Sequence, residues 1–219
     1  MFNLSLYKAI IFDMDGVLVD SEDVILQAAL AGLKEYDVTA SPEDFTPFIG
    51  AGEDRYIGGV AQKYGKPYKI EMKTRVYDIY LTLVNTHIKV YSGTNTILQF
   101  FSEKGFVMGI GSSADRVKVN ANLKAAKIPV SFFRKIFCGE DVERKKPFPD
   151  IYIQTAAALG INPSQCCVIE DAVNGIKAAK SAGMAACGIT TSFTEGELLA
   201  AGADAVVSRI EDLQLFYFQ

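Results

Sequence analysis

The sequence predicts an α/β protein in which a doubly wound parallel sheet carries an inserted α-helical cap domain. Three observations lead to this prediction: an apolar strand that ends in Asp13-Met14-Asp15, a helical block directly after it, and a regular alternation of strands and helices from Ser92 onward. Strands separated by helix-length segments are typical of parallel sheets that have helices on both faces. A chain of 219 residues is long enough for one large α/β domain with a smaller insert.

The first strand is the apolar, β-branched run at residues 8–12, which ends abruptly in two aspartates. Its length and composition are typical of a buried strand in a parallel sheet. Carboxylates at the end of such a strand are costly to bury unless they are paired or bind a metal. Ligands of open α/β sheets bind at the carboxyl ends of the strands. We therefore expect Asp13 and Asp15 at the active edge of the sheet, with a cation nearby.

The segment between the first strand and Ser92 has no strand pattern and is predicted to be helical. Ser21 is expected to cap its first helix, with Glu22 and Asp23 favourably placed in the first turn. The expected helices cover residues 21–36, 53–64 and 68–84. This block predicts a cap domain at residues 21–91, inserted into a core domain formed by residues 1–20 and 92–219.

Strands and helices alternate through the remainder of the chain. Gly105, Gly160 and Gly183 each follow a predicted helix, as is typical of helix ends. The expected helices cover residues 94–104, 114–127, 150–159 and 172–182, and the expected strands cover residues 106–111, 136–138, 166–169, 185–189 and 205–207. The aromatic-rich end of the chain, residues 215–219, is expected to be a frayed strand or a tail.

Composition and charge argue against two classes of partner. The formal net charge is −4, so the chain has no basic footprint and nucleic acid is not an expected partner. No apolar run reaches the roughly 18 residues of a membrane span. Residues 1–12 are apolar but lack the basic start and the cleavage site of a signal peptide, so we expect a strand there and no membrane association.

We expect no catalytic role for the cysteines or for the single histidine. Cys138, Cys166, Cys167 and Cys187 form no Cys-x-x-Cys pair and all lie in predicted strands, so we expect buried, reduced thiols in a cytoplasmic protein. Cys166 and Cys167 are adjacent, which should place their side chains on opposite faces of a strand. His87 has no nearby histidine or cysteine in the sequence, which argues against Ser-His-Asp hydrolysis and most zinc chemistry.

Three further groups of polar residues follow predicted strands. Ser112-Ser113 follows the strand at 106–111, Lys146 comes after the strand near Ile136, and Glu170-Asp171 follows the strand at 166–169. Taken singly, the serine could cap a helix, the lysine could be solvated, and the acidic pair could begin the next helix. Their arrival at the same ends of successive strands favours a shared site instead.

Phosphoryl transfer is the chemistry that suits this set of side chains. Clustered carboxylates favour a hard, oxygen-ligated cation such as Mg²⁺. One carboxylate can act as nucleophile and form an aspartyl phosphate, while Mg²⁺ and a lysine offset the repulsion between the two anions. A serine hydroxyl and backbone N–H groups can hold the phosphate oxygens. A second aspartate two residues further on can protonate the leaving oxygen and then accept a proton from water.

These residues resemble, in order, the four motifs of the haloacid dehalogenase superfamily. Asp13-Met14-Asp15-Gly16-Val17 resembles motif I, Ser112 fits motif II, Lys146 fits motif III and Glu170-Asp171 fits motif IV. The motifs together span most of the chain. The resemblance implies a Rossmann-like core, and it implies a hydrolase that acts on phosphate esters.

The wider sequence is similar to the β-phosphoglucomutase-like branch of this superfamily, whose members carry a helical cap. The similarity rests on the insert after motif I and on residues 146–150 and 169–172. Residues 112–116, together with residues 47–50, are also similar to the phosphatase-like domain of a plant chloroplast protein.

The resemblance implies a role for each matching carboxylate. Asp13 would be the nucleophile and a Mg²⁺ ligand, and Asp15 would be the general acid and base, with its backbone carbonyl on the metal. Asp171 would be the third protein ligand, and Glu170 would lie in the first or second coordination shell. Dehalogenase members lack this metal set and the second aspartate of motif I, so Asp15 and Asp171 favour phosphate esters over haloacids.

The resemblance also implies which residues bind the substrate. Ser112, Ser113 and Lys146 would bind the phosphoryl group. Sugar phosphomutases of this branch carry a histidine near the position of Ile25 and an arginine in the cap loop, where this chain has Gly50-Ala51-Gly52-Glu53-Asp54-Arg55. Glu53 would repel a second phosphate, although Arg55 is a candidate substitute for the missing arginine. This loop is either a plain hinge-like turn or a specificity loop that closes over the site.

Three functions remain open from the sequence. The first is a Mg²⁺-dependent phosphatase of a small, sugar phosphate-like metabolite, expected to be a monomer. The second is a β-phosphoglucomutase-type phosphomutase of hexose phosphates. The third is a non-catalytic relative, including a receiver-like domain that accepts phosphate on Asp13. We favour the phosphatase because the cap lacks the residues that grip two phosphates in turn.

Overall fold

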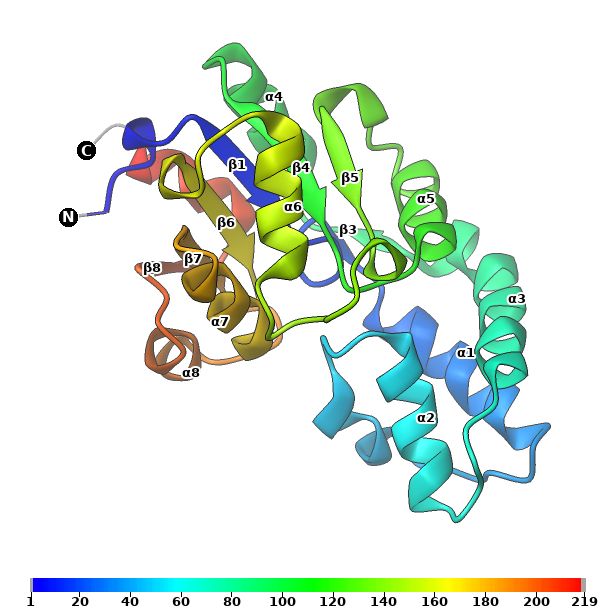
Figure 1. Cartoon of the computed structure of the whole chain (residues 1–219). Helices are drawn as coiled ribbons and strands as arrows, with labels where there is room; N and C mark the ends of the chain where they lie inside the picture. The colour runs from blue at the N-terminus through cyan, green and yellow to red at the C-terminus, as the bar shows by residue number, and fades with distance from the viewer. Residues whose placement is uncertain (1, 218–219) are drawn as a thin grey trace.

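The computed structural model describes residues 2–217, which form a six-stranded sheet with helices on both faces and a group of three helices beside it (Figure 1). The strands lie in the order β5-β4-β1-β6-β7-β8, and every neighbouring pair is parallel. Their bounds are β1 Ala9–Phe12, β4 Val107–Gly111, β5 Lys135–Phe137, β6 Cys166–Glu170, β7 Ala185–Ile189 and β8 Ala205–Val207. The predicted doubly wound parallel sheet is confirmed.

Two apolar clusters, one on each face of the sheet, hold the helices in place. Residues of α6, α7 and α8 pack on one face, and residues of α4, α5 and the 3₁₀ helix η7 pack on the other. The bounds are α4 Thr94–Glu103, α5 Arg116–Ala125, α6 Asp150–Leu159, α7 Val173–Ser181, α8 Glu195–Ala200 and η7 Ile210–Phe216. Cys166 and Cys167 belong to different clusters, so they lie on opposite faces as predicted.

Strand β1 lies at the point where the direction of chain winding reverses. The chain builds outward from β1 through β4 and β5 on one side and through β6, β7 and β8 on the other. The crevice at such a switch point is the usual ligand site of an open α/β sheet. Asp13 directly follows β1, and its backbone N–H still donates to Ile169 of β6 at 3.0 Å. The fold therefore places this aspartate at the carboxyl edge of the sheet.

The three helices beside the sheet share an apolar cluster of their own. We call α1 (Glu22–Lys34), α2 (Glu53–Lys63) and α3 (Ile70–His87) the cap helices. Their buried residues include Leu33, Ile57 and Val76, which belong to one cluster. Two short strands, β2 (Val19–Asp20) and β3 (Lys89–Val90), pair antiparallel where the chain leaves and re-enters the core. This grouping supports a cap that is separate from the core. The predicted cap boundaries, residues 21 and 91, remain a prediction.

Several local features differ from the sequence predictions. Strands β2 and β3 have only two residues each and are too short to show an alternating pattern. The six-residue helix α8 begins with a capping box at Thr194 and was also not predicted. Cys138 does not lie in a strand, because β5 ends at Phe137. The predicted tail is also partly wrong, since Leu215 lies in η7 while residues 218–219 lie outside the described part of the chain.

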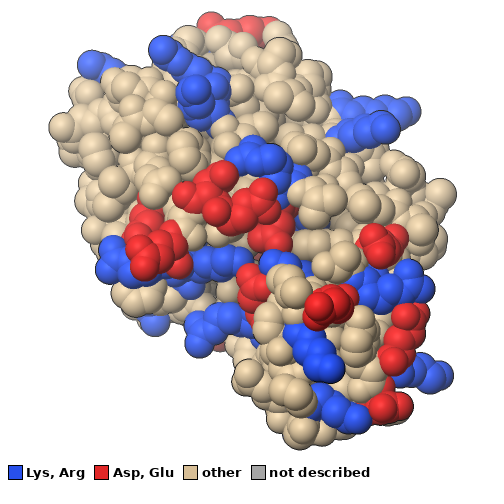
Figure 2. Space-filling view, turned by 45° about the vertical axis from the view of Figure 1, so that its right-hand side comes forward, with Lys and Arg blue, Asp and Glu red and all other residues tan. Residues whose placement is uncertain are grey.

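Two observations bear on the partners that composition disfavours. No described helix is both long and apolar enough to cross a membrane. On the face drawn in Figure 2, basic and acidic side chains are interspersed without a continuous basic stripe.

The four cysteines are free thiols, all buried.

Candidate active site

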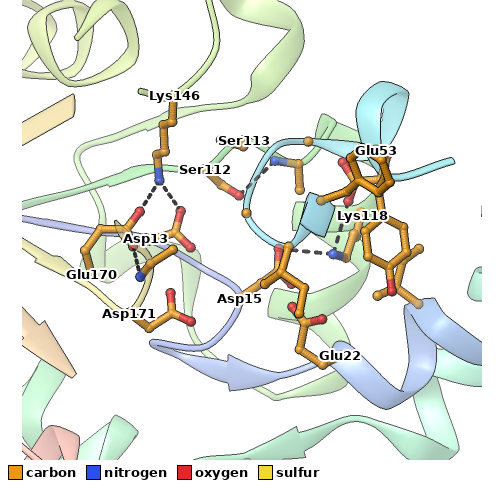
Figure 3. A pocket seen from close by; sticks show the side chains of 18 residues that line it. Asp13, Asp15, Glu22, Glu53, Ser112, Ser113, Lys118, Lys146, Glu170 and Asp171 are labelled. Atoms are coloured by element: carbon orange, nitrogen blue, oxygen red, sulfur yellow. Dashed lines mark hydrogen bonds and ion pairs between the residues drawn. The ribbon is translucent and has the colours of Figure 1, made fainter. Parts of the chain in front are cut away.

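A pocket lies between the carboxyl edge of the sheet and the cap helices (Figure 3). Its cavity volume of about 50 Å³ has room for a few water molecules. Nearly all of the site residues predicted from the sequence line it: Asp13, Asp15, Glu53, Ser112, Ser113, Lys146, Glu170 and Asp171. The tertiary fold thus brings together side chains that are up to 158 positions apart, from Asp13 to Asp171.

Lys146 lies between two carboxylates that line the pocket (Figure 3). Its Nζ is 2.6 Å from Asp13 Oδ1 and 2.7 Å from Glu170 Oε1. The lysine is only 3% exposed, so the alternative of a solvated side chain is wrong. Burial would lower the pKa of Lys146, but Asp13 and Glu170 raise it well above its ordinary value. The ammonium therefore stays charged beside the nucleophile candidate.

The buried position of Asp13 disfavours the ionised form of its carboxyl group. Burial raises the pKa of Asp13 to about 7, Lys146 opposes this rise, and Glu170 and Asp15 add to it. One lysine therefore does not fully compensate the buried carboxylates around it. A further cation at this position would favour the ionised form of Asp13, which is the form that can attack phosphorus.

Glu170 is held so that it fixes Lys146. Its Oε1 accepts from Lys146 and from the Tyr152 hydroxyl, the latter at 3.1 Å, and its Oε2 accepts from the Ala172 N–H at 2.7 Å. Lys146 also lies over the Tyr152 ring, 4.9 Å from the centroid. A Cβ at Gly175 would lie 1.6 Å from Glu170 Oε1, so the first turn of α7 needs glycine there. Glu170 therefore holds Lys146 in place, in addition to preceding helix α7.

Asp15 has a separate set of partners on the other side of the pocket. Lys118 Nζ is 3.2 Å from its Oδ2, and Asn122 Nδ2 donates to its Oδ1 at 2.9 Å. The Ser21 hydroxyl also donates to Oδ1. Ser21 occupies the N-cap position of α1 as predicted, yet its side chain makes no capping bond. The prediction that it caps the helix is wrong, because the hydroxyl is used to hold Asp15.

Lys118 joins Asp15 to the cap. Its Nζ is also 3.1 Å from Glu53 Oε1 on α2, and the residue is 3% exposed. Burial would lower the pKa of Lys118, but Asp15 and Glu53 raise it well above its ordinary value. Figure 3 shows this lysine between the two carboxylates, with Glu22 on the adjacent wall.

Asp171 lies beside Asp13 without a cation within ion-pair distance in the described part of the chain. Burial raises the pKa of Asp171 well above its ordinary value, with Glu170 and Asp13 adding to the rise and the Ser192 hydroxyl donating to Oδ2. Gly16 has φ +80°, and a Cβ there would lie 2.0 Å from Asp171 Oδ2. The turn after β1 thus leaves room for this carboxylate.

The chemistry of these carboxylates fits a hard divalent cation. Asp13 and Asp171 are buried, acidic and only partly compensated, and such oxygen ligands are those that Mg²⁺ prefers. Within residues 2–217, no three Asp, Glu, His or Cys side chains are already gathered around a metal position. Both oxygens of Glu170 accept from protein donors, which favours a supporting position for Glu170.

The two serines after β4 line the pocket from the core side. Ser112 is buried and its Oγ accepts from the Ala114 N–H at 3.1 Å, which shapes the turn into α5. Ser113 is also buried, and its Oγ has no hydrogen-bond partner. Both serines line the pocket.

The cap contributes a different set of residues from the one expected. Glu53, Tyr56 and Ile25 line the pocket, but Arg55 does not. Arg55 is exposed, because residues three and four apart share one helix face and Arg55 lies two positions after Glu53. The suggestion that Arg55 replaces the arginine of the phosphomutases is therefore wrong.

Sequence reasoning missed Lys118, Asn122, Glu22 and Tyr152. Lys118 and Asn122 share the inward face of α5, where their i, i+4 spacing was a weak signal. Glu22 was assigned only to the first turn of α1, although it also lines the pocket. No local pattern distinguishes these polar residues from solvated ones, because their partners lie far away in the sequence.

Comparisons with known proteins agree with this geometry. Residues 10–189 match the family model described as haloacid dehalogenase-like hydrolase. The chain is 38% identical over 215 residues to the chloroplast protein Suppressor of quenching 1 of Arabidopsis thaliana. That match covers 95% of this chain but 20% of the relative, so the chain spans a fifth of the length of that protein.

Two further proteins match over nearly their whole length. A phosphorylated carbohydrates phosphatase of Thermotoga maritima is 30% identical over 220 residues, with 95% of this chain and 97% of the relative covered. The crystal structure of a β-phosphoglucomutase from Clostridium difficile superposes with a TM-score of 0.84 at 22% identity, covering 97% of each chain. The latter shows a shared fold. The chain therefore belongs to the haloacid dehalogenase-like hydrolases, a family of enzymes.

Proposed function

We propose that this chain is a Mg²⁺-dependent phosphatase that hydrolyses a small phosphorylated metabolite through an aspartyl phosphate. One observation carries the proposal: the two carboxylates after β1 are held by two different buried lysines, Asp13 by Lys146 and Asp15 by Lys118. This arrangement supports two separate tasks, attack on phosphorus and proton transfer. The name of the Thermotoga relative supports a phosphorylated carbohydrate as the kind of substrate.

Asp13 is the proposed nucleophile. Lys146 contacts Oδ1, which leaves Oδ2 as the atom that attacks the phosphorus. The new Oδ2–P bond forms as the bond from phosphorus to the leaving oxygen breaks. Lys146, Ser112 and Ser113 would bind the phosphate oxygens and stabilise the charge that develops on them.

Asp15 is the proposed general acid and base. It gives its proton to the leaving oxygen, which departs as an alcohol, and then accepts a proton from the water that attacks the aspartyl phosphate. Inorganic phosphate leaves and Asp13 returns to its carboxylate form. Asn122 and Ser21 hold Asp15 in one orientation during both steps.

Asp13, Asp171 and the main chain at Asp15 would hold the Mg²⁺ ion, with Glu170 supporting Lys146 and the loop beside it. The ion would neutralise the charge that gathers when a phosphate dianion meets buried carboxylates. The four free thiols support a reducing, cytoplasmic location, and a monomer is the proposed form.

Phosphate release from a panel of phosphorylated metabolites, with Mg²⁺ or with EDTA, tests this proposal. We expect turnover that needs Mg²⁺ and falls about a thousandfold or more in Asp13→Asn. Mass spectrometry of acid-quenched enzyme should find phosphate on the peptide that contains Asp13. Glu71→Gln, on the exposed start of α3, is the matched control and should keep full activity. Unchanged turnover in Asp13→Asn would refute the nucleophile assignment.

The same panel separates the alternatives. A phosphomutase would isomerise β-glucose 1-phosphate faster than it releases phosphate, and it would need a bisphosphate activator. The apolar Ile25 in the pocket and the outward-facing Arg55 favour hydrolysis. A receiver-like protein would hold a stable phosphate on Asp13 after treatment with acetyl phosphate and would hydrolyse no ester.

A further inference from the structure

The cap side of the pocket has more carboxyl groups than basic side chains. On the core side, Asp13, Glu170 and Asp171 face Lys146 and the proposed divalent cation. On the cap side, Asp15, Glu22 and Glu53 face a single lysine. That lysine, Lys118, already contacts Asp15 and Glu53, so it is not free to bind a second anion.

Glu53 has an oxygen that is buried and unused. Lys118 lies 3.1 Å from Oε1, whereas Oε2 is buried and has no hydrogen-bond partner. The residue is 5% exposed and lines the pocket that the leaving group of a substrate has to enter. A buried carboxylate oxygen without a donor is unfavourable, and a donor on the substrate would satisfy it.

A groove continues outward from the same wall. It has a volume of about 400 Å³ and shares Glu22, Ile49 and Tyr56 with the pocket. Its lining includes the acidic Asp23 and Glu43 and no lysine or arginine. A leaving group too large for the inner pocket would extend along this acidic groove.

These observations define the chemistry of the leaving group. We propose that the enzyme takes phosphate monoesters of uncharged or cationic alcohols, with Glu53 Oε2 accepting a hydrogen bond from a hydroxyl or ammonium group of the leaving alcohol. Glu53, joined by Glu22 in its ionised form, rejects a second phosphate or a carboxylate on that alcohol. This inference rests on the proposed phosphatase function and adds the substrate class to it.

Five esters of similar size test the inference with Mg²⁺ present. Glycerol 1-phosphate and phosphoethanolamine carry a donor, propyl phosphate carries none, and 2-phosphoglycolate and 3-phosphoglycerate carry an anion. We expect kcat/KM for glycerol 1-phosphate to exceed that for propyl phosphate by about 10-fold or more, because hydrogen bonds to charged groups have effects of this size. We expect the anionic esters to be slower than propyl phosphate.

Glu53→Gln tests the residue itself. Since Glu53 also holds Lys118, we expect lower rates for every ester, and the informative value is the ratio between esters. The advantage of glycerol 1-phosphate over propyl phosphate should fall about 10-fold, and the disadvantage of 2-phosphoglycolate should shrink similarly. Glu71→Gln should leave both ratios unchanged, since Glu71 is exposed and lines none of the described pockets.

Binding supplies a readout that does not need turnover. Calorimetric titration of Asp13→Asn should find tighter binding of glycerol 1-phosphate than of 2-phosphoglycolate, and Glu53→Gln in that background should remove the difference. The inference is overturned if the wild-type enzyme hydrolyses 2-phosphoglycolate as well as glycerol 1-phosphate, or if Glu53→Gln leaves the ratios unchanged. A wild-type enzyme that hydrolyses no ester at all overturns the proposed function, and the inference with it.

Discussion

Lys118 and Lys146 are buried lysines whose charges the fold must compensate. Each is 3% exposed and lies between two carboxylates, so each pair of contacts replaces the water that the ammonium loses. Pairs of this kind contribute little net stability when intact. Removing one partner is costly, because the remaining charge stays buried without compensation.

Lys118→Met should therefore destabilise the protein by about 3 kcal/mol, since Asp15 and Glu53 would lose their shared cation. The free energy of unfolding in urea is the measurement. Lys180→Met is the matched control, because the Lys180–Asp204 pair is about one-third exposed on both sides and should cost at most about 1 kcal/mol. Equal losses in the two variants would contradict the buried-pair interpretation.

Glu22 should make stability depend on pH. Burial raises the pKa of Glu22 from 4.5 to about 7, with Lys118 opposing the rise and Asp15 and Glu53 adding to it. The folded state thus binds this proton more tightly than the unfolded chain does. The resulting stability is fully present below about pH 4.5 and is lost as the pH rises to about 7.

Glu22→Gln should flatten this dependence, on the order of 1–3 kcal/mol between pH 4.5 and pH 8. Urea unfolding across that range in EDTA measures it, with Glu71→Gln as the control. An unchanged pH profile in Glu22→Gln would show that Glu22 does not titrate in this window.

Helix α7 contributes to the site through a position that has no side chain. Its third residue is Gly175, in a first turn where alanine would form helix more readily. The absent side chain leaves room for Glu170, which in turn holds Lys146. Gly175 thus lowers the helix propensity of this turn, and the space that it leaves allows Glu170 to hold Lys146.

Gly175→Ala should displace Glu170 and reduce kcat by about 10-fold or more, because the loss of one positioned charge in a site has effects of this order. Steady-state kinetics with unfolding curves measures both effects. Gly196→Ala is the control in α8, where a Cβ would meet nothing within 4 Å. That variant should keep full activity and gain up to about 1 kcal/mol of stability.

On the scale of the whole molecule, an ion cluster joins the cap helices to the core. Lys73 on α3 contacts Asp54 of the cap and Asp115 of the core, each at 2.8 Å. Lys145, next to Lys146, contacts Asp54 at 3.1 Å. Burial opposes ionisation of Asp54, but hydrogen bonds from Lys73, Tyr68 and Lys145 hold its pKa well below the usual range. These contacts hold the cap helices against the core, an arrangement that we call closed.

Asp54→Asn should weaken closure and lower kcat/KM by several-fold, since partly exposed ion pairs contribute roughly 1 kcal/mol each. High salt should reproduce part of this loss in the wild-type enzyme and little in the variant. Asp37→Asn is the control, because Asp37 pairs with Lys66 at an exposed site within the cap. Equal salt sensitivity in Asp54→Asn and wild type would exclude a role for the cluster in closure.

The parallel sheet, and the strand ends at which polar side chains gather, can be predicted from the residues alone. Asp13, Ser112, Lys146 and Asp171 could be found in this way because the ends of parallel strands meet at one edge, whatever path the connections take. Apolar runs and glycine stops have local causes, so most helices and strands were predicted to within a few residues.

Which polar side chains of the helices face the pocket depends on how the helices pack, and this could not be predicted from the sequence. Lys118 is in sequence an ordinary basic residue of an exposed-looking helix, yet its partners are Asp15 and Glu53, which the fold alone brings to it. Arg55 was the opposite case, a plausible ligand that the turn of α2 directs outward. The direction of a helical side chain depends on how the whole helix is packed, and that packing is set by contacts between residues far apart in the chain.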